Sequence, residues 1–352
     1  FLIWNSAISY ILGFFQKGSK KKFLYFGLIY IVIFQNLFYI LSEITTPNIS
    51  NQNQTFVVAI QPNIPMSGLD DKKWLYLRQR HIELAENALR QINEQRTTNN
   101  EQSTIVIFPE SPMNFMYARD EEFREFLRGF ASRNNVHVLF NSAEPSAKGD
   151  RFHNSAVMVN ERGEKIVQYD KIHLMPFGEY MPLSELVGQI LPPMVGNFAF
   201  GEEYDLVPLG EARAGVMICF ESHFPGLSNE FVRNGADALI EITNDGYLGN
   251  TPVLRQHLAN AVFRAVETNR PVLRVTNVGI TAFINERGEV LDAADVYTEA
   301  TRIWTVGKSD GGQTVYVKYG DWFAVLCLII SLGLLFLTFL KNSRNNAQNT
   351  QR

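Results

Sequence analysis

The stretch Ala214-Gly215-Val216-Met217-Ile218-Cys219-Phe220-Glu221-Ser222 changes in character halfway along its length. Its first five residues are glycine or apolar and predict a buried strand, because short apolar runs fit strands that are covered on both faces. The residues after them carry a thiol, a carboxylate and a hydroxyl. Catalytic groups commonly lie where a rigid strand passes into a loop. Cys219 is therefore either a nucleophile at a strand end or a small residue of the core.

Short apolar runs alternate with helical stretches on both sides of this segment and predict an α/β layered fold. The expected strands are 56–61, 104–108, 136–141, 214–219, 238–243 and 271–276, and the expected helices are 71–95, 120–134, 225–234 and 253–269. Two hairpins are also expected, 154–160 with 165–169 and 280–285 with 290–292, each around a Glu-Arg-Gly-Glu turn. This mixture predicts a sandwich with the sheets inside and the helices outside.

The composition of the chain argues against several classes of protein. At 352 residues it can hold one large domain or two ordinary ones. A net charge of -4 and a pI near 5.9 argue against a nucleic-acid binder, which usually has a basic face. Two cysteines give neither a disulfide framework nor a zinc spacing, and the six histidines form no metal-binding motif. We expect an unpaired Cys219 thiol, no metal and no cofactor.

Long apolar segments flank the predicted domain. Residues 23–41 and 322–340 each have about the 20 residues that a helix needs to cross a bilayer. Residues 1–16 are also largely apolar and are interpreted as the end of another membrane helix. Because the chain starts within apolar sequence and without Met, we expect further segments upstream.

Basic residues predict how these segments are oriented. Lysines cluster in the loop 17–22, and Lys341 and Arg344 lie in the tail 341–352. The positive-inside rule places both clusters in the cytoplasm. The catalytic domain expected at 56–310, after a linker at 42–55, then lies outside the cytoplasm.

Three predicted strands end in groups that can do chemistry. The strand at 104–108 precedes Glu110, the central segment precedes Cys219, and the strand at 238–243 precedes Asn244 and Asp245. Lys171 follows a hairpin. A thiol needs a base, and acyl transfer needs a positive or hydrogen-bonding group at the developing oxyanion. A Glu, a Lys and a Cys together supply base, oxyanion partner and nucleophile, although each alone is more often solvated or part of the core.

Pro109-Glu110-Ser111, Tyr169-Asp170-Lys171-Ile172-His173-Leu174 and Ile218-Cys219-Phe220-Glu221, in this order, resemble the nitrilase superfamily of carbon–nitrogen hydrolases. The separations also fit, at 61 residues from Glu110 to Lys171 and 48 from Lys171 to Cys219. The resemblance covers about residues 56–306 and implies an αββα sandwich with a Glu-Lys-Cys triad. It implies that Glu110 is the general base, that Lys171 stabilises the tetrahedral intermediate and that Cys219 is the nucleophile.

Further motifs resemble the apolipoprotein N-acyltransferases, the integral-membrane branch of this superfamily. They are KIHLMPFGEYMP at 171–182, QPNIP at 61–65, TND at 243–245 and RAVETNRP at 264–271. The resemblance implies a monomeric, multi-pass enzyme of the bacterial inner membrane, with a periplasmic catalytic domain between the last two of eight membrane helices. It implies ping-pong chemistry, in which the thiolate takes an acyl chain from the sn-1 ester of a phospholipid as a thioester. The α-amino group of the diacylglyceryl-cysteine of an apolipoprotein then receives that chain.

The same resemblance implies supporting residues around the triad. Glu179 and Glu221 correspond to further active-site carboxylates, and Trp74 to a functional tryptophan on a mobile segment. The backbone N–H of Phe220 is expected to help hold the oxyanion. Two positions depart from the family pattern, because Phe220 replaces a common tyrosine and Tyr247 replaces a common tryptophan that serves as a lid contact.

Two other functions fit parts of the pattern. A membrane-anchored amidase of the nitrilase type would use the same three residues and would pass the acyl group of a small amide to water. A catalytically inactive nitrilase-like binding domain would not need Glu110, Lys171 and Cys219 intact. The membrane spans and the Phe177-Gly178-Glu179-Tyr180 stretch favour the transferase, whose site we expect to open toward the bilayer.

Overall fold

The computed structural model describes residues 54–95, 103–110, 115–182 and 198–350. The segments predicted at 1–16, 17–22 and 23–41, and most of the linker predicted at 42–55, lie outside the described residues. The chain divides into two compact units, one of residues 47–318 and one that combines residues 1–46 with 319–352.

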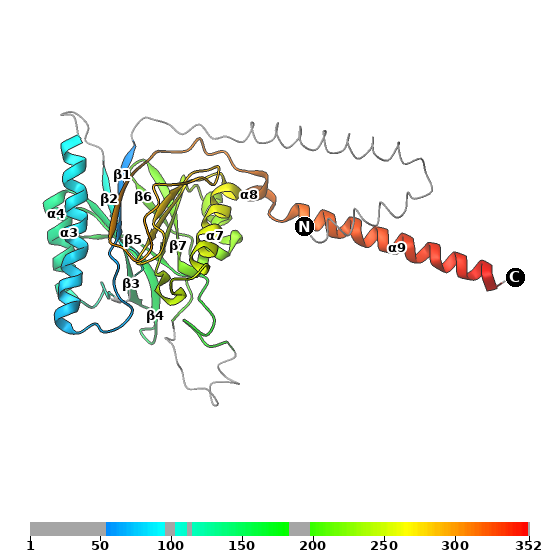
Figure 1. The fold of residues 1–352 in the computed structure, drawn as a ribbon, viewed down its shortest axis with the longest axis horizontal. Coiled ribbons are helices and arrows are strands. Elements are labelled where there is room, and N and C mark those ends of the chain that lie inside the picture. Colours follow the sequence, from blue (N-terminus) through cyan, green and yellow to red (C-terminus); the bar gives the residue numbers. More distant parts are fainter. Residues whose placement is uncertain (1–53, 96–102, 111–114, 183–197, 351–352) are drawn as a thin grey trace. The chain divides into compact units, whose positions relative to one another are not determined.

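Two six-stranded sheets form the centre of the larger unit (Figure 1). The first has the order β12-β1-β2-β3-β4-β5, with β1 at Thr55–Gln61, β2 at Thr104–Ile107, β3 at His137–Pro145, β4 at Phe152–Val159, β5 at Lys165–Asp170 and β12 at Ala300–Val306. The second has the order β11-β10-β9-β8-β7-β6, with β6 at Leu206–Leu209, β7 at Ala212–Ile218, β8 at Ala238–Thr243, β9 at Val272–Thr276, β10 at Ala282–Ile284 and β11 at Val290–Leu291. In each sheet three neighbouring strands are parallel, β1-β2-β3 and β7-β8-β9, and antiparallel strands flank them.

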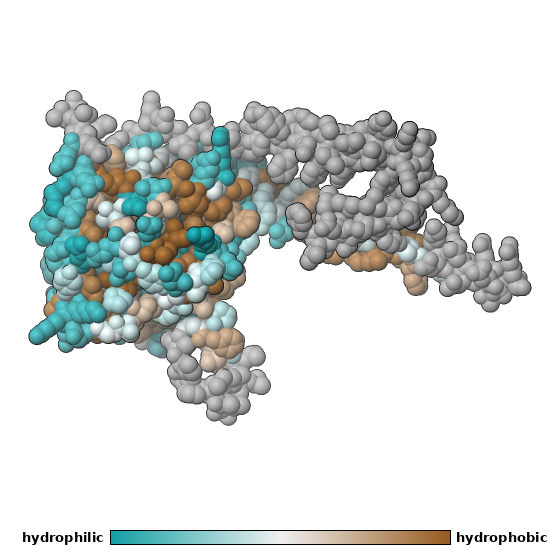
Figure 2. Space-filling model, in the orientation of Figure 1, coloured by the Kyte–Doolittle hydropathy of each residue, from teal (hydrophilic) through white to brown (hydrophobic). Residues whose placement is uncertain are grey.

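Helices cover the outer faces of the sheets and complete the predicted αββα sandwich. Helices α3 (Asp71–Gln95) and α4 (Glu121–Asn134) lie on one side, and α7 (Val253–Thr268) lies on the other (Figure 1). Helix α6 (Pro225–Arg233) packs against α7 and β7. The edge of the unit formed by α3 is covered by hydrophilic side chains (Figure 2), as expected for a helix with one solvated face.

The parallel strands are buried on both faces. In β1, Val57 and Ala59 belong to the core between the sheets, whereas Val58 and Ile60 pack in the core under α3 and α4. Successive side chains of a strand point to opposite faces, so both sets of positions must be apolar. This is why these strands appear in the sequence as continuous apolar runs.

Two strands were not predicted, and several strand ends differ from the prediction, most notably at β3, which extends to Pro145 instead of Asn141. β12 was not predicted, because its apolar residues follow no regular period and only Trp304 and Val306 are buried, yet it pairs with the whole of β1. β6 was also missed, since it has only four residues. The strand predicted to end at Cys219 ends at Ile218, because Cys219 adopts a left-handed conformation and begins the short 3-10 helix η1 (Cys219–His223).

The described part of the smaller unit is helical. After the short helix α8 (Val315–Tyr319), which begins in the larger unit, helix α9 runs from Trp322 to Thr350. Its segment Trp322–Leu340 has a mean hydropathy of 2.8, and none of its most apolar stretch is buried. Among the described residues it is the one helix long and apolar enough to cross a membrane, and it coincides with the span predicted at 322–340.

Two glycines give a matched test of the packing between β7 and α6. A Cβ atom on Gly215 would lie 2.2 Å from Cγ of Phe231, a buried residue of α6, whereas a Cβ on Gly226 would meet nothing within 4 Å. We expect Gly215→Ala to lower the free energy of unfolding by about 1–3 kcal/mol, because it overpacks the core. Gly226→Ala is expected to be neutral or slightly stabilising, because alanine favours helix. Thermal unfolding followed by circular dichroism would contradict this packing if the two variants behaved alike.

Candidate active site

The sheet topology brings the predicted triad to one edge of the sandwich. Glu110 follows β2 by three residues, Lys171 follows β5 directly, and Cys219 follows β7 directly. β5 runs in the same direction as β2, because β3 pairs in parallel with β2 and two antiparallel pairings lead from β3 to β5. The carboxyl ends of β2 and β5 therefore lie at the same edge of the first sheet. β7 belongs to the second sheet and runs parallel to β8, and the backbone N–H of Asn244, which follows β8, donates to Glu110. The charges of Glu110 and Lys171 act on the Cys219 thiol, so the triad lies together.

Lys171 is a buried cation. Its side chain is 1% exposed, and Nζ lies 3.0 Å from Oε1 and 2.8 Å from Oε2 of Glu179. Burial opposes the charge, but attraction from Glu110 and Glu179 outweighs burial and holds the pKa of Lys171 above its usual value. A permanent positive charge in a site shielded from water can stabilise an oxyanion strongly.

Glu110 is held by two donors. Asn154 Nδ2 donates to Oε1 at 3.2 Å, and the backbone N–H of Asn244 donates to Oε2 at 3.1 Å. Burial raises the pKa of Glu110 despite the opposing charge of Lys171. A carboxylate with a raised pKa is a stronger base, so Glu110 is suited to accept a proton.

Asn154 was not identified from the sequence. Its Nδ2 also donates to Oε1 of Glu179 at 2.6 Å, so one amide group binds the carboxylates of both Glu110 and Glu179. It lies near the start of β4, which is antiparallel to β3, and this end of β4 therefore lies at the same edge of the sheet as Lys171. Only the antiparallel pairing reveals that position, because an asparagine in a hairpin strand has no distinctive local pattern.

Cys219 sits at a sharp turn from strand to helix. Its φ of +52° lies in the left-handed region, which costs a residue other than glycine about 1–3 kcal/mol. Such a turn presents a nucleophile at the top of a sheet. Burial and then the charge of Glu110 raise the pKa of the thiol, and Lys171 only partly opposes them. The resting thiol is thus protonated and must lose its proton as it reacts.

Glu221 joins the two sheets at this edge. It is fully buried and accepts four hydrogen bonds, from Tyr169 Oη (2.8 Å) and from the backbone N–H groups of Ile172 (2.8 Å), His173 (3.0 Å) and Ile218 (2.9 Å). Burial raises its pKa to about 7, against the opposing effects of Lys171 and the donors. Its contacts connect the segment after Lys171 with the turn at Cys219, so Glu221 holds these two parts of the site in place.

Exposed apolar side chains surround the site. Met175 and Phe177 are exposed in the loop after Lys171, where the backbone N–H of Met175 donates to Glu179 Oε2 at 2.8 Å. Tyr247, in the short helix η2 (Asp245–Leu248), is 81% exposed. Desolvation and then the charge of Glu110 raise the pKa of the Tyr247 hydroxyl, so this residue lies close enough to the triad to be affected by the charge of Glu110.

The remaining predicted residues differ in their surroundings. Phe220 lies in η1, with its ring 4.8 Å from that of His223 and 5.3 Å from that of Phe224. Trp74 lies in the first turn of α3, where its ring centroid is 6.1 Å from that of Phe115. Trp74 therefore lies on a helix, and its side chain packs against the core between α3 and the first sheet.

Four ionisable side chains form a second buried group, of which only Asp245 was named from the sequence. They are Glu241 in β8, Asp245 in η2, His257 in α7 and Arg274 in β9. Glu241 and Arg274 occupy paired positions of the parallel strands β8 and β9 and form an ion pair. The sequence did contain a signal for this pair, a charge in the middle of each of two apolar runs, Ile240-Glu241-Ile242 and Leu273-Arg274-Val275. Buried charges are nearly always paired, so two such runs indicate an ion pair between them.

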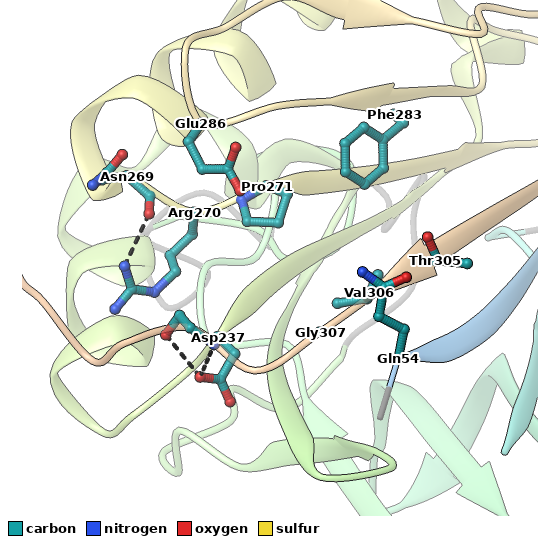
Figure 3. A pocket seen from close by; sticks show the side chains of 11 residues that line it. Gln54, Asp237, Asn269, Arg270, Pro271, Phe283, Glu286, Thr305, Val306 and Gly307 are labelled. Atoms are coloured by element: carbon teal, nitrogen blue, oxygen red, sulfur yellow. Dashed lines mark hydrogen bonds between the residues drawn. The ribbon is translucent and has the colours of Figure 1, made fainter. Parts of the chain in front are cut away.

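A cavity of about 170 Å³ lies at the opposite edge of the sheets (Figure 3). Asp237 and Pro271, which line it, precede β8 and β9, and Val306, which also lines it, ends β12. Arg270 in its wall already donates to the carbonyls of Ala236 and Asn269. The cavity is therefore remote from the triad. Within the described parts of the chain, no group of three or more His, Cys, Asp or Glu side chains is placed to hold a metal.

Glu221 and Tyr169 allow a graded test of the support between the sheets. Glu221→Gln replaces one acceptor oxygen by an NH₂ group and leaves at least one buried N–H unpaired, at a cost of about 1–3 kcal/mol. Tyr169→Phe removes one of the four donors and is expected to cost less. Denaturant unfolding and the alkylation rate of Cys219 should therefore change more for Glu221→Gln, and equal effects of the two substitutions would contradict this role.

Comparisons with known proteins agree with this geometry. A family model described as carbon-nitrogen hydrolase matches residues 47–316. The apolipoprotein N-acyltransferase of Geobacter metallireducens is 33% identical over 245 residues, which cover 68% of this chain and 47% of the relative. That of Thermotoga maritima is 31% identical over 299 residues, which cover 82% of this chain and 52% of the relative. The chain spans about half the length of these curated relatives.

The fold is similar to that of several solved structures, and the similarity extends over nearly the whole length of those structures. A member of branch 10 of the nitrilase superfamily from Saccharomyces cerevisiae gives a TM-score of 0.56 at 18% identity and covers 74% of this chain and 93% of its own. An amidase from Nesterenkonia sp. gives 0.53 at 16% identity and covers 78% of this chain and 98% of its own. Identities this low support the fold alone. The family match over residues 47–316, most of the chain, shows that the chain belongs to the carbon–nitrogen hydrolase family.

Proposed function

We propose that this chain carries the catalytic unit of an apolipoprotein N-acyltransferase. The acyl donor is the sn-1 ester of a membrane phospholipid, and the acceptor is the α-amino group of the diacylglyceryl-cysteine of an apolipoprotein. The observation that carries the proposal is the convergence of Glu110, Lys171 and Cys219 at one buried edge of the sandwich. The names of the curated relatives support the choice of acyl transfer.

Acylation begins when Cys219 Sγ attacks the ester carbonyl and Glu110 accepts the thiol proton. The thiol is protonated at rest, so the proton moves as the S–C bond forms. Lys171 Nζ and the backbone N–H of Phe220 stabilise the tetrahedral oxyanion. When the ester C–O bond breaks, Glu110 returns the proton to the leaving oxygen and releases a lysophospholipid.

Deacylation repeats these steps with a different nucleophile. The neutral amino group of the acceptor attacks the thioester carbonyl, and Glu110 accepts a proton from the nitrogen. The C–S bond then breaks, an amide is formed, and the proton on Glu110 returns to the departing sulfur. The same base and the same oxyanion donors thus serve both halves of the reaction.

The surroundings of the site favour an acyl chain over a small amide. Transfer of an acyl chain of about 16 carbons into water is unfavourable by about 0.8 kcal/mol for each CH₂ group. Met175, Phe177 and Tyr247 are exposed near the triad, and α9 has the length and hydropathy of a membrane span. An amidase that acts on a small soluble amide needs neither feature.

The proposed thioester can be detected as a covalent adduct. We expect the purified protein, incubated with phospholipid, to gain the mass of one acyl chain on Cys219, and Cys219→Ala to gain none. Cys327→Ala is the matched control, because Cys327 lies in α9 and should not affect the adduct. Glu110→Gln should slow acylation by about 10²- to 10⁴-fold, the usual contribution of a general base.

The pH profile supplies a second criterion in the same experiment. Glu110 must be deprotonated to accept the proton, and burial raises its pKa, so acylation should fall with decreasing pH at values above the ordinary range of a carboxyl group.

An adduct in Cys219→Ala, or one that maps to Cys327, would exclude the proposed nucleophile.

We also propose that the protein is a monomeric, multi-pass protein of the bacterial inner membrane with the catalytic unit in the periplasm. The apolar helix α9 and the positive charges that follow it support this orientation. Protease added outside spheroplasts should cleave within residues 56–310, whereas intact cells, whose outer membrane excludes protease, should protect them. Protection of the unit in spheroplasts that lose a known periplasmic control protein would contradict the topology.

A further inference from the structure

We propose that His257 is a positioning residue that orients the peptide unit between Cys219 and Phe220 for oxyanion binding. The inference rests on the acyl transfer proposed above, since it concerns the same nucleophile. His257 itself touches no reacting atom. It acts through the backbone, and behind it lies the buried group of Asp245, Arg274 and Glu241.

The ring of His257 is held from both sides. Nδ1 lies 2.8 Å from Oδ1 of Asp245 and 3.3 Å from Nη2 of Arg274. Nε2 lies 3.3 Å from the carbonyl oxygen of Cys219 and 3.3 Å from Oε1 of Glu241. Both neighbours of Nε2 are acceptors, so Nε2 is the nitrogen that donates to the Cys219 carbonyl. The side chain is buried in α7, so water does not compete for either contact.

Asp245 is itself fixed, which makes the ring orientation rigid. Nη2 of Arg274 lies 2.8 Å from Oδ2 of Asp245, and Nη1 of Arg274 forms an ion pair with Glu241. Burial opposes ionisation of Asp245, but Arg274 and then His257 outweigh burial and lower its pKa to about 2. The carboxylate is therefore charged under all ordinary conditions. A carboxylate that fixes the orientation of a histidine ring is a recurring support in enzyme sites.

The contact with Cys219 reaches the oxyanion site because a peptide unit is planar. The carbonyl of Cys219 and the N–H of Phe220 belong to one trans peptide and point in opposite directions. No cis peptide bond occurs in the described parts of the chain. A donor on the carbonyl side therefore sets the direction of the N–H on the other side. Ser222 Oγ donates to the same carbonyl at 3.3 Å and adds to this constraint.

The hydrogen bond from His257 acts on a residue whose backbone conformation is unfavourable. Cys219 is in the left-handed region with φ of +52°, and nothing local to a cysteine favours that conformation. A hydrogen bond to its carbonyl stabilises the turn and also polarises the peptide, so the Phe220 N–H becomes a better donor. We infer that loss of His257 weakens the oxyanion site while the thiol and its base remain.

Two reagents separate the oxyanion site from the thiol. p-Nitrophenyl butyrate acylates Cys219 through a tetrahedral oxyanion and releases nitrophenolate, whereas iodoacetamide alkylates the thiol by direct displacement without one. In the full chain purified in detergent, we expect His257→Leu to slow acylation by about 100-fold, similar to loss of one oxyanion donor. Its alkylation rate should stay near that of the unmodified chain.

Two further variants show whether the effect belongs to the hydrogen bond. His257→Gln keeps an N–H donor at the position of Nε2 and should recover most of the acylation rate. Thr268→Val is the matched control on α7, because it removes a buried hydroxyl that donates to the carbonyl of Arg264 at 2.6 Å and should leave the ratio of the two rates unchanged. If His257→Leu does not fold, Asp245→Asn provides the same test through loss of the charge that orients the ring.

The inference is overturned if acylation and alkylation fall together in these variants, since His257 would then support only the thiol or the fold. It is also overturned if acylation is unchanged in folded His257→Leu. Failure of the proposed function is distinguished by the unmodified chain, which would then form no adduct with phospholipid. The ratio of the rates with the nitrophenyl ester and iodoacetamide still reports on His257 in that case.

Discussion

The site depends on one buried carboxylate, that of Glu221. Its four hydrogen bonds connect Tyr169 of β5, the backbone after Lys171 and the last residue of β7. β5 and β7 belong to different sheets, so this side chain fixes the end of β5 against the end of β7. The separation between Lys171 and Cys219 is thus set by short hydrogen bonds as well as by the packing of apolar side chains.

Burial and the neighbouring charges together determine the charge states of the site. Lys171 keeps its proton because carboxylates surround it, and the Cys219 thiol keeps its proton because burial and Glu110 disfavour a thiolate. The resting nucleophile is therefore a thiol beside a base whose pKa is raised. Proton transfer can occur within the site when a substrate carbonyl arrives, and a thiolate need not persist between turnovers. Support for the turn at Cys219 comes from two sides, from Glu221 and from the group around His257.

Several elements could be predicted from local sequence, and several could not. The helix at 71–95 and the strand at 238–243 were predicted with the bounds that the structure has, because the first is a long helical stretch and the second is a mainly apolar run. β12 was missed because an edge strand that is only partly buried has no clear pattern. Asn154, His257 and Arg274 were missed for a different reason. Each gains its role from a partner in another element, and a single polar residue does not indicate which partner it will meet.

The sequence by itself determined the α/β class, the apolar span at 322–340 and the order of Glu110, Lys171 and Cys219, because apolar periodicity and motif order are properties of the chain alone. Only the tertiary structure decided that Cys219 leaves the strand in a left-handed turn and that Glu221 joins two sheets. It also decided that the carbonyl of Cys219 meets His257. These features depend on contacts between residues far apart along the chain, and on charges whose states are set by burial, which local sequence does not specify.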